Sequence, residues 1–260
     1  MRNFLKLINS FAKAAVFCLL FELLITAGNL NAQVKNQQNL PKDADLEKFV
    51  ATAQEYSNLY RGSSPMQYRF KYTGTYFAYS DNFEKGDVWY NGKLYKDVFL
   101  NLNSHRDELY VKVEKTGLIV KLNSDFVQDF SIGKRNYTFV AEKITDKISP
   151  EKYIDSGYYE LLYSGDAKLY KKIRKTYSER INHFVSSTTG SQIERIFSAN
   201  VRYYLLKEGK IIRIKRVSNL LSVYRDQKKD LRQYARRANL EFHEDKDFAM
   251  SMVMKYVYSK

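Results

Sequence analysis

The chain has 260 residues and a formal net charge of +14 at pH 7, from 43 Lys and Arg against 29 Asp and Glu. It contains one cysteine, three prolines and eleven glycines, but 22 tyrosines and 16 phenylalanines. The scarcity of Pro and Gly argues against a low-complexity or disordered protein, and a single cysteine excludes a fold held together by internal disulfides. Tyr and Phe favour strands because flat rings pack well on a pleated surface, so the composition indicates a β-rich globular protein.

The first 32 residues have the order of features found in a secretory signal peptide. Three basic residues precede an almost wholly apolar run from Ala14 to Thr26, and Ala32 precedes a polar segment that begins at Gln33. The run contains Glu22 and is shorter than the roughly 20 apolar residues of a membrane-spanning helix, so we expect cleavage after Ala32 instead of an uncleaved anchor. Removal of these 32 residues from the 260-residue chain leaves 228, and it also removes Cys18, so the mature chain has no thiol.

Three regions follow from this pattern: a signal peptide over residues 1–32, a flexible polar tail over 33–42, and a single β-rich domain over 43–260. We expect the exported protein in the periplasm or associated with the outer membrane. The domain is predicted to begin with a short helix from Asp43 to Tyr60, which Gly62 ends.

From Met66 onwards the apolar period changes to two. Leu109, Val111 and Val113 alternate with other residue types, as in half-buried strands. Asn91-Gly92 is the strongest turn signal, because both residues can adopt the positive φ angles of a two-residue hairpin. The pattern predicts about eight to eleven strands in an antiparallel meander, as a curled sheet or an open barrel. Further turns are predicted at Thr116-Gly117, Gly133-Lys134, Gly165-Asp166 and Glu208-Gly209, and a longer loop at Ser186 to Gln192.

After the last strand the pattern becomes helical. Leu220, Tyr224 and Leu231 recur at helical spacing and predict one basic helix. A final helix is predicted from Asp245 to Tyr258, with acidic residues at its N-terminus, where they meet the positive end of the helix dipole. The expected fold class is therefore α+β: a mainly antiparallel β meander with a short N-terminal helix and two C-terminal helices, ending in a basic helical segment over about residues 217–260.

Several stretches of the mature chain follow one order of residues: Gly86 to Tyr95, Val98 to Leu100, Asp107 to Leu109, Gly157 to Leu162, Leu169 to Lys172, Tyr203-Tyr204, and Arg236-Arg237 before Leu240 to Phe242. This order resembles a recurring pattern in secreted proteins of Bacteroidota for which no activity is established. The resemblance covers most of the mature chain and has no single diagnostic motif. It implies export and a fold formed as one unit, and it assigns no catalytic or binding residue.

The sequence presents no catalytic or cofactor motif. It has no HExxH, no paired CxxC, no EF-hand loop, no GxSxG and no phosphate-binding glycine loop. His243 with Glu244, Asp245 and Asp247 is a candidate for metal ligation, but the acidic start of a helix explains these residues better. We therefore predict no catalytic residue, no cofactor and no metal, and a binding protein over an enzyme. The alternative is an envelope-polymer hydrolase whose carboxylates come together only in the fold.

The positive charge is concentrated in one segment. Residues 33–165 hold 18 basic and 18 acidic residues, whereas residues 166–240 hold 19 basic and 6 acidic residues. Like charges four residues apart on the predicted basic helix cost an isolated helix about 0.2–0.5 kcal/mol each. Either acids elsewhere in the fold or an anionic partner would offset this cost. The predicted anion-binding residues are Lys171, Lys172, Arg174, Lys228, Lys229, Arg232, Arg236 and Arg237.

These features favour an exported, non-catalytic binding or scaffold protein of the bacterial cell envelope that docks on an anionic surface. The compartment favours anionic lipid, an acidic glycan or an envelope protein as the partner and disfavours nucleic acid, despite the mixture of basic and aromatic residues. The competing explanation is that the basic segment is only a solvated surface, as charge runs commonly are.

Overall fold

The computed structural model describes residues 58–182, 192–242 and 244–259, all of which belong to one compact unit, Tyr56–Lys260. The predicted signal peptide, the tail over residues 33–42 and almost all of the predicted helix from Asp43 to Tyr60 lie outside the described residues. Of that helix only its end is described, as a short 3-10 helix, η3 (Asn58–Tyr60), with Leu59 buried.

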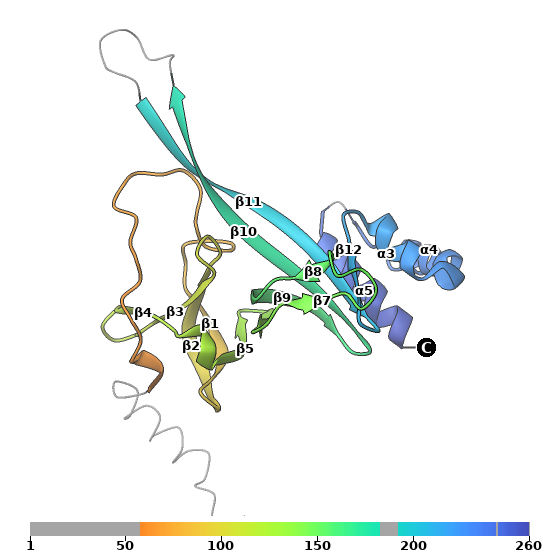
Figure 1. Ribbon diagram of the computed structural model, residues 1–260, viewed down its shortest axis with the longest axis horizontal. Helices are drawn as coiled ribbons and strands as arrows, with labels where there is room; N and C mark the ends of the chain where they lie inside the picture. The colour runs from red at the N-terminus through yellow and green to blue at the C-terminus, as the bar shows by residue number, and fades with distance from the viewer. Residues whose placement is uncertain (1–57, 183–191, 243, 260) are drawn as a thin grey trace, which may run out of the picture. The chain divides into compact units, whose positions relative to one another are not determined.

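The described residues form a ten-stranded antiparallel sheet in the order β12-β11-β10-β9-β6-β5-β1-β2-β3-β4 (Figure 1). The predicted fold class, mainly antiparallel sheet with C-terminal helices, is therefore confirmed. The strands are β1 (Glu84–Tyr90), β2 (Lys93–Asn103), β3 (Glu108–Lys112), β4 (Ile119–Lys121), β5 (Val127–Ile132), β6 (Arg135–Val140), β9 (Gly157–Ser164), β10 (Ala167–Asn182), β11 (Gln192–Lys207) and β12 (Lys210–Arg213).

A second, two-stranded sheet pairs β7 (Ile144–Thr145) with β8 (Tyr153–Ile154). The described part of the chain thus has twelve strands, one more than the upper end of the expected range. Strands β7 and β8 were not predicted, because each has only two residues, which is too short to show an alternating pattern.

The predicted turns lie where the strands reverse. Asn91 and Gly92 have φ angles of 51° and 72° and join β1 to β2. Glu208 and Gly209, at 53° and 78°, join β11 to β12 in the same way. Positive φ at both central positions matches the right-handed twist of the flanking strands, which is why these dipeptides specify hairpins.

Three α-helices follow the sheet, where two were expected: α3 (Val217–Val223), α4 (Lys228–Arg237) and α5 (Lys246–Tyr258). The single basic helix predicted from Leu220 onwards is interrupted at Tyr224, which has φ −105° and ψ 58°, and a 3-10 turn, η5 (Arg225–Gln227), follows. Tyr224 is buried, and its hydroxyl lies 3.2 Å from the hydroxyl of Tyr258 on α5. The interruption therefore lets α3 and α4 pack against the final helix as separate segments.

Three hydrophobic clusters of described residues lie along the sheet. The smallest contains Tyr159, Tyr170 and Ile211, and the other two are larger. One contains inward-facing side chains of the first strands, such as Val88, Leu100 and Phe130. The other joins Leu169 and Leu205, on β10 and β11, to the C-terminal helices.

Candidate functional site

Lys171, a predicted anion-binding residue, is buried on β10 with only 5% of its side chain exposed. Its Nζ donates to the hydroxyl of Tyr79 at 2.6 Å, lies 3.4 Å from Oε2 of Glu160, and forms an ion pair with Asp247. Glu160 comes from β9 and Asp247 from α5, so one ammonium group ties the segment before β1, the sheet and the last helix together.

The tyrosines around Lys171 complete this cluster. The hydroxyl of Tyr79 donates to Oε2 of Glu160 at 2.5 Å, and the hydroxyl of Tyr203 donates to Oδ1 of Asp247 at 2.8 Å. Burial and the neighbouring Glu160 carboxylate raise the pKa of Tyr79, so its hydroxyl keeps its proton as a donor. Glu160 and Asp247 therefore both interact with the ammonium group of Lys171, and their role is structural.

Lys172 is also held by internal partners. Its Nζ donates to both carboxylate oxygens of Asp107, at 2.8 and 2.7 Å, and to the carbonyl oxygen of Tyr158 at 2.9 Å. Burial lowers the pKa of Lys172, and the Asp107 carboxylate opposes that shift. A Cβ atom at Gly157, where φ is +129°, would lie 2.0 Å from Oδ2 of Asp107, so only glycine fits beside this ion pair.

These positions require a correction to the predicted site. Both Lys171 and Lys172 were predicted to bind an anion, but each is paired with an acid from a distant part of the chain. Breaking a buried pair leaves an uncompensated charge, which is costly. We therefore leave Lys171 and Lys172 out of the candidate surface.

The predicted residues of α4 lie on the outside of the helix. Leu231 and Ala235 are buried and face the other helices. Lys228, Lys229, Arg232 and Arg236 lie within about 100° of one another around the helix axis, which follows from 3.6 residues per turn. Lys229, Arg232, Arg236 and Arg237 are exposed and Lys228 is half-buried. We call Lys228, Lys229, Arg232 and Arg236 the α4 basic face. Arg237 lies about 180° from Lys228 around the axis, close to the angle of Asp230, and is not part of this face.

Arg174, the remaining predicted residue, is exposed on β10, and the structure adds neighbours to it from across the hairpin. β10 and β11 pair over their whole length, so Arg202 lies opposite Lys172 and Asn200 lies opposite Arg174. Sequence analysis missed Arg202 because the connection between the strands is not a two-residue turn and so does not define their register.

Most other basic residues of the 166–240 segment are also exposed. Seven of these exposed residues have no ion pair with any residue that the structure describes: Lys168, Arg180, Lys210, Arg213, Lys215, Arg216 and Arg225. The charge surplus of this segment therefore lies largely at the surface.

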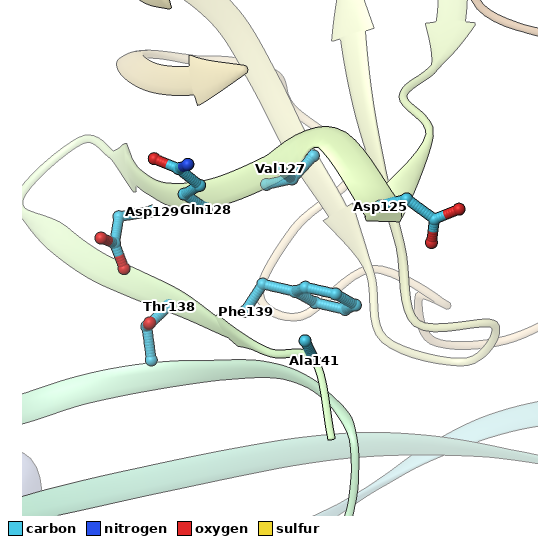
Figure 2. A pocket seen from close by; sticks show the side chains of 7 residues that line it. All are labelled: Asp125, Val127, Gln128, Asp129, Thr138, Phe139 and Ala141. Carbon is cyan, nitrogen blue, oxygen red and sulfur yellow. The ribbon is translucent and has the colours of Figure 1, made fainter. Parts of the chain in front are cut away.

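An open hollow of about 480 Å³ lies beside β5 and β6, lined by Asp125, Val127, Gln128, Asp129, Thr138, Phe139 and Ala141. Figure 2 shows the carboxylates of Asp125 and Asp129 on opposite sides of Phe139, pointing away from each other. A glycosidase needs two carboxylates that flank the same bond. This hollow therefore lacks the arrangement that the alternative function, an envelope-polymer hydrolase, requires.

Two of the three acidic residues near His243, Asp245 and Asp247, are used within the fold. Asp245 caps α5 by accepting a hydrogen bond from the backbone of Phe248 at 2.9 Å, and Asp247 belongs to the Lys171 cluster. His243 itself lies outside the described residues. Among the residues that the structure describes, no three His, Cys, Asp or Glu side chains are grouped so as to hold a metal ion.

Comparison with protein-family models, with curated proteins and with solved structures found no match for this chain. The resemblance to secreted proteins of Bacteroidota therefore stays a prediction. In the part of the chain that the structure describes, no helix is both long enough and apolar enough to cross a membrane.

Proposed function

We propose that this protein is an exported, non-catalytic binding or scaffold protein of the bacterial cell envelope that docks on an anionic surface through the basic residues of its C-terminal half. The observation that carries the proposal is the separation of two kinds of basic residue. Lys171 and Lys172 are neutralised inside the fold, whereas the α4 basic face is exposed and has no ion pair among the described residues.

The α4 basic face is suited to a surface and not to a single small ligand. Its four cations lie along one side of the helix, and no acidic residue of α4 lies within their arc of about 100°. Each basic residue close to an anionic membrane contributes about 1 kcal/mol to binding. Several such residues together would give firm, salt-sensitive attachment without a pocket.

The test compares the parent protein with a Lys228→Glu/Arg232→Glu/Arg236→Glu variant on vesicles of phosphatidylglycerol and phosphatidylcholine, and on an immobilised acidic polysaccharide. We expect the variant to bind vesicles about a hundredfold or more weakly, because three favourable contacts become repulsive. Parent binding should also weaken from about 0.1 M to about 1 M salt, as the screening length falls from about 10 to about 3 Å.

The matched control reverses three exposed lysines of the balanced half, Lys96, Lys134 and Lys152, which changes net charge equally. We expect this control to retain most of the vesicle binding. A parent protein that binds neither vesicles nor acidic polysaccharide at low salt would refute the proposed function, and the basic residues would then be only a solvated surface.

A further inference from the structure

The outer face of the β10–β11 hairpin carries a row of arginines and small polar residues. β9 pairs with β10 only as far as Lys171. From Lys172 onwards β10 and β11 continue together as a two-stranded hairpin (Figure 1). Alternate side chains of each strand share a face. One face is formed by Arg174, Thr176, Ser178 and Arg180 of β10 with Glu194, Ile196, Ser198, Asn200 and Arg202 of β11, and we call it the arginine strip. Its one acidic residue, Glu194, lies opposite Arg180 at the far end of the strip.

The opposite face of the hairpin is covered around Tyr177 and Phe197, although Ile181, Ile193 and Val201 on that face are exposed. Tyr177 and Phe197 pack against Phe70 and Tyr68, with ring centroids 5.5 and 5.1 Å apart respectively. The segment that carries Tyr68 and Phe70 is attached to β11 by two backbone hydrogen bonds of Thr73, at 2.8 and 3.0 Å. On the same face Arg195 pairs with Glu179 at 3.1 Å.

The arginine strip is more open than the area around Tyr177 and Phe197, and it holds three arginines against one acid, Glu194. Its members are exposed, except for the half-buried Ile196. Arg174 and Arg202 are neighbours, since Arg202 lies opposite Lys172, two residues before Arg174. Like charges on adjacent strands repel and destabilise a sheet. Asp107 compensates Lys172, but the described residues offer no ion pair to Arg174 or Arg202.

The chemistry of the strip indicates one class of ligand. A guanidinium group binds a carboxylate or sulfate with two parallel hydrogen bonds. Hydroxyl and amide groups between the arginines can bond to sugar hydroxyls. The strip is extended, and six residues of strand separate Arg174 from Arg180 by about 20 Å, so it matches a linear ligand. It has no exposed large apolar side chain that would insert into a bilayer.

We infer that the arginine strip binds a linear acidic polysaccharide, with Arg174 and Arg202 as the principal ligands for its carboxylate or sulfate groups. This inference rests on the proposed function and deepens it. The α4 basic face docks the protein on an anionic surface, and the strip recognises the glycan class.

The experiment measures binding of the full mature chain to polygalacturonate by calorimetry. It compares an Arg174→Gln/Arg202→Gln variant of the strip, an Arg232→Gln/Arg236→Gln variant of α4, and a Lys96→Gln/Lys134→Gln control that removes the same charge from exposed positions outside both surfaces. We expect the strip variant to lose about tenfold or more in affinity, because charge-assisted bidentate contacts are among the strongest hydrogen bonds. The Lys96→Gln/Lys134→Gln control should change polymer affinity by about twofold or less, and the α4 variant should lose less affinity than the strip variant. Fully methyl-esterified polymer, which lacks the carboxylates, should not bind.

The outcomes separate the two proposals. If the parent binds anionic vesicles but not polygalacturonate, the glycan inference is overturned and the proposed function stands. Equal losses in the strip and α4 variants, or undiminished binding of the esterified polymer, would also overturn it. A parent that binds neither probe refutes the proposed function and the inference together.

Discussion

Asp146 is the residue whose ionisation is coupled most directly to the fold. It follows β7, and its Oδ1 accepts hydrogen bonds from the backbone nitrogens of Ile148 and Ser149, both at 2.8 Å. Its Oδ2 accepts from the backbone nitrogen of Ile211, on β12, at 2.5 Å. These backbone donors, Ile211 first, lower the pKa of Asp146 to about 2 from its ordinary value of 3.8.

We predict that Asp146 stabilises the fold only while it is ionised. A carboxyl group with a lowered folded-state pKa contributes stability above its unfolded-state pKa, and that contribution disappears as the pH falls through the folded-state value. Asp146→Asn should therefore be less stable than the parent at pH 7, because its amide cannot accept all three bonds. Urea unfolding between pH 7 and pH 2 should show the difference shrinking below about pH 4. A difference that stays constant across this range would contradict the prediction.

At the same scale, Lys171 and Lys172 show what sequence reasoning could not supply. Their local pattern is that of exposed strand residues, and nothing near them in sequence marks them as buried. Their partners Asp107 and Asp247 lie 65 and 76 residues away. Only the assembled sheet, with Gly157 leaving room for one of the pairs, brings the acids to them.

Helix α4 depends on a small apolar contact under a large charged surface. Leu231 is fully buried in the cluster that joins the sheet to the helices, as its position in the helical pattern predicted. We predict that Leu231→Ala lowers the free energy of unfolding by about 2–5 kcal/mol through lost burial and the cavity left behind. The neighbouring, exposed Arg232→Ala should change it by about 0.5 kcal/mol or less. Chemical denaturation of both variants measures the contrast, and equal small effects would show that α4 is not anchored by Leu231.

The elements differed in how far they could be predicted. Asn91-Gly92 and Glu208-Gly209 specify their hairpins because the turn chemistry is local. The separation of α3 from α4 could not be predicted, since it depends on the contact between Tyr224 and Tyr258 on another helix. The register of β10 against β11 was hidden for a similar reason, and with it the position of Arg202 beside Arg174.

In the molecule as a whole, the charge is divided between two uses. The concentration of basic residues between 166 and 240 was evident in the sequence. Composition alone did not separate the lysines that stabilise the fold from the arginines and lysines left at the surface. That division suits a protein that must keep its internal pairs in any salt concentration while its surface attachment remains sensitive to salt.

Export is the part of the proposal on which the choice of partner depends, because acidic envelope glycans and outer leaflets are met only outside the cytoplasm. The order of basic start, apolar run and small residues before Gln33 predicts cleavage by signal peptidase. Expressed in a bacterium with its native N-terminus, the protein should be recovered from the envelope or periplasmic fraction with Gln33 as its first residue, as N-terminal sequencing would show. A Leu19→Arg/Leu20→Arg variant, which interrupts the apolar run, should remain in the cytoplasm at full length. If the parent also stays there uncleaved, the envelope assignment is wrong, and acidic partners inside the cell become the ones to test.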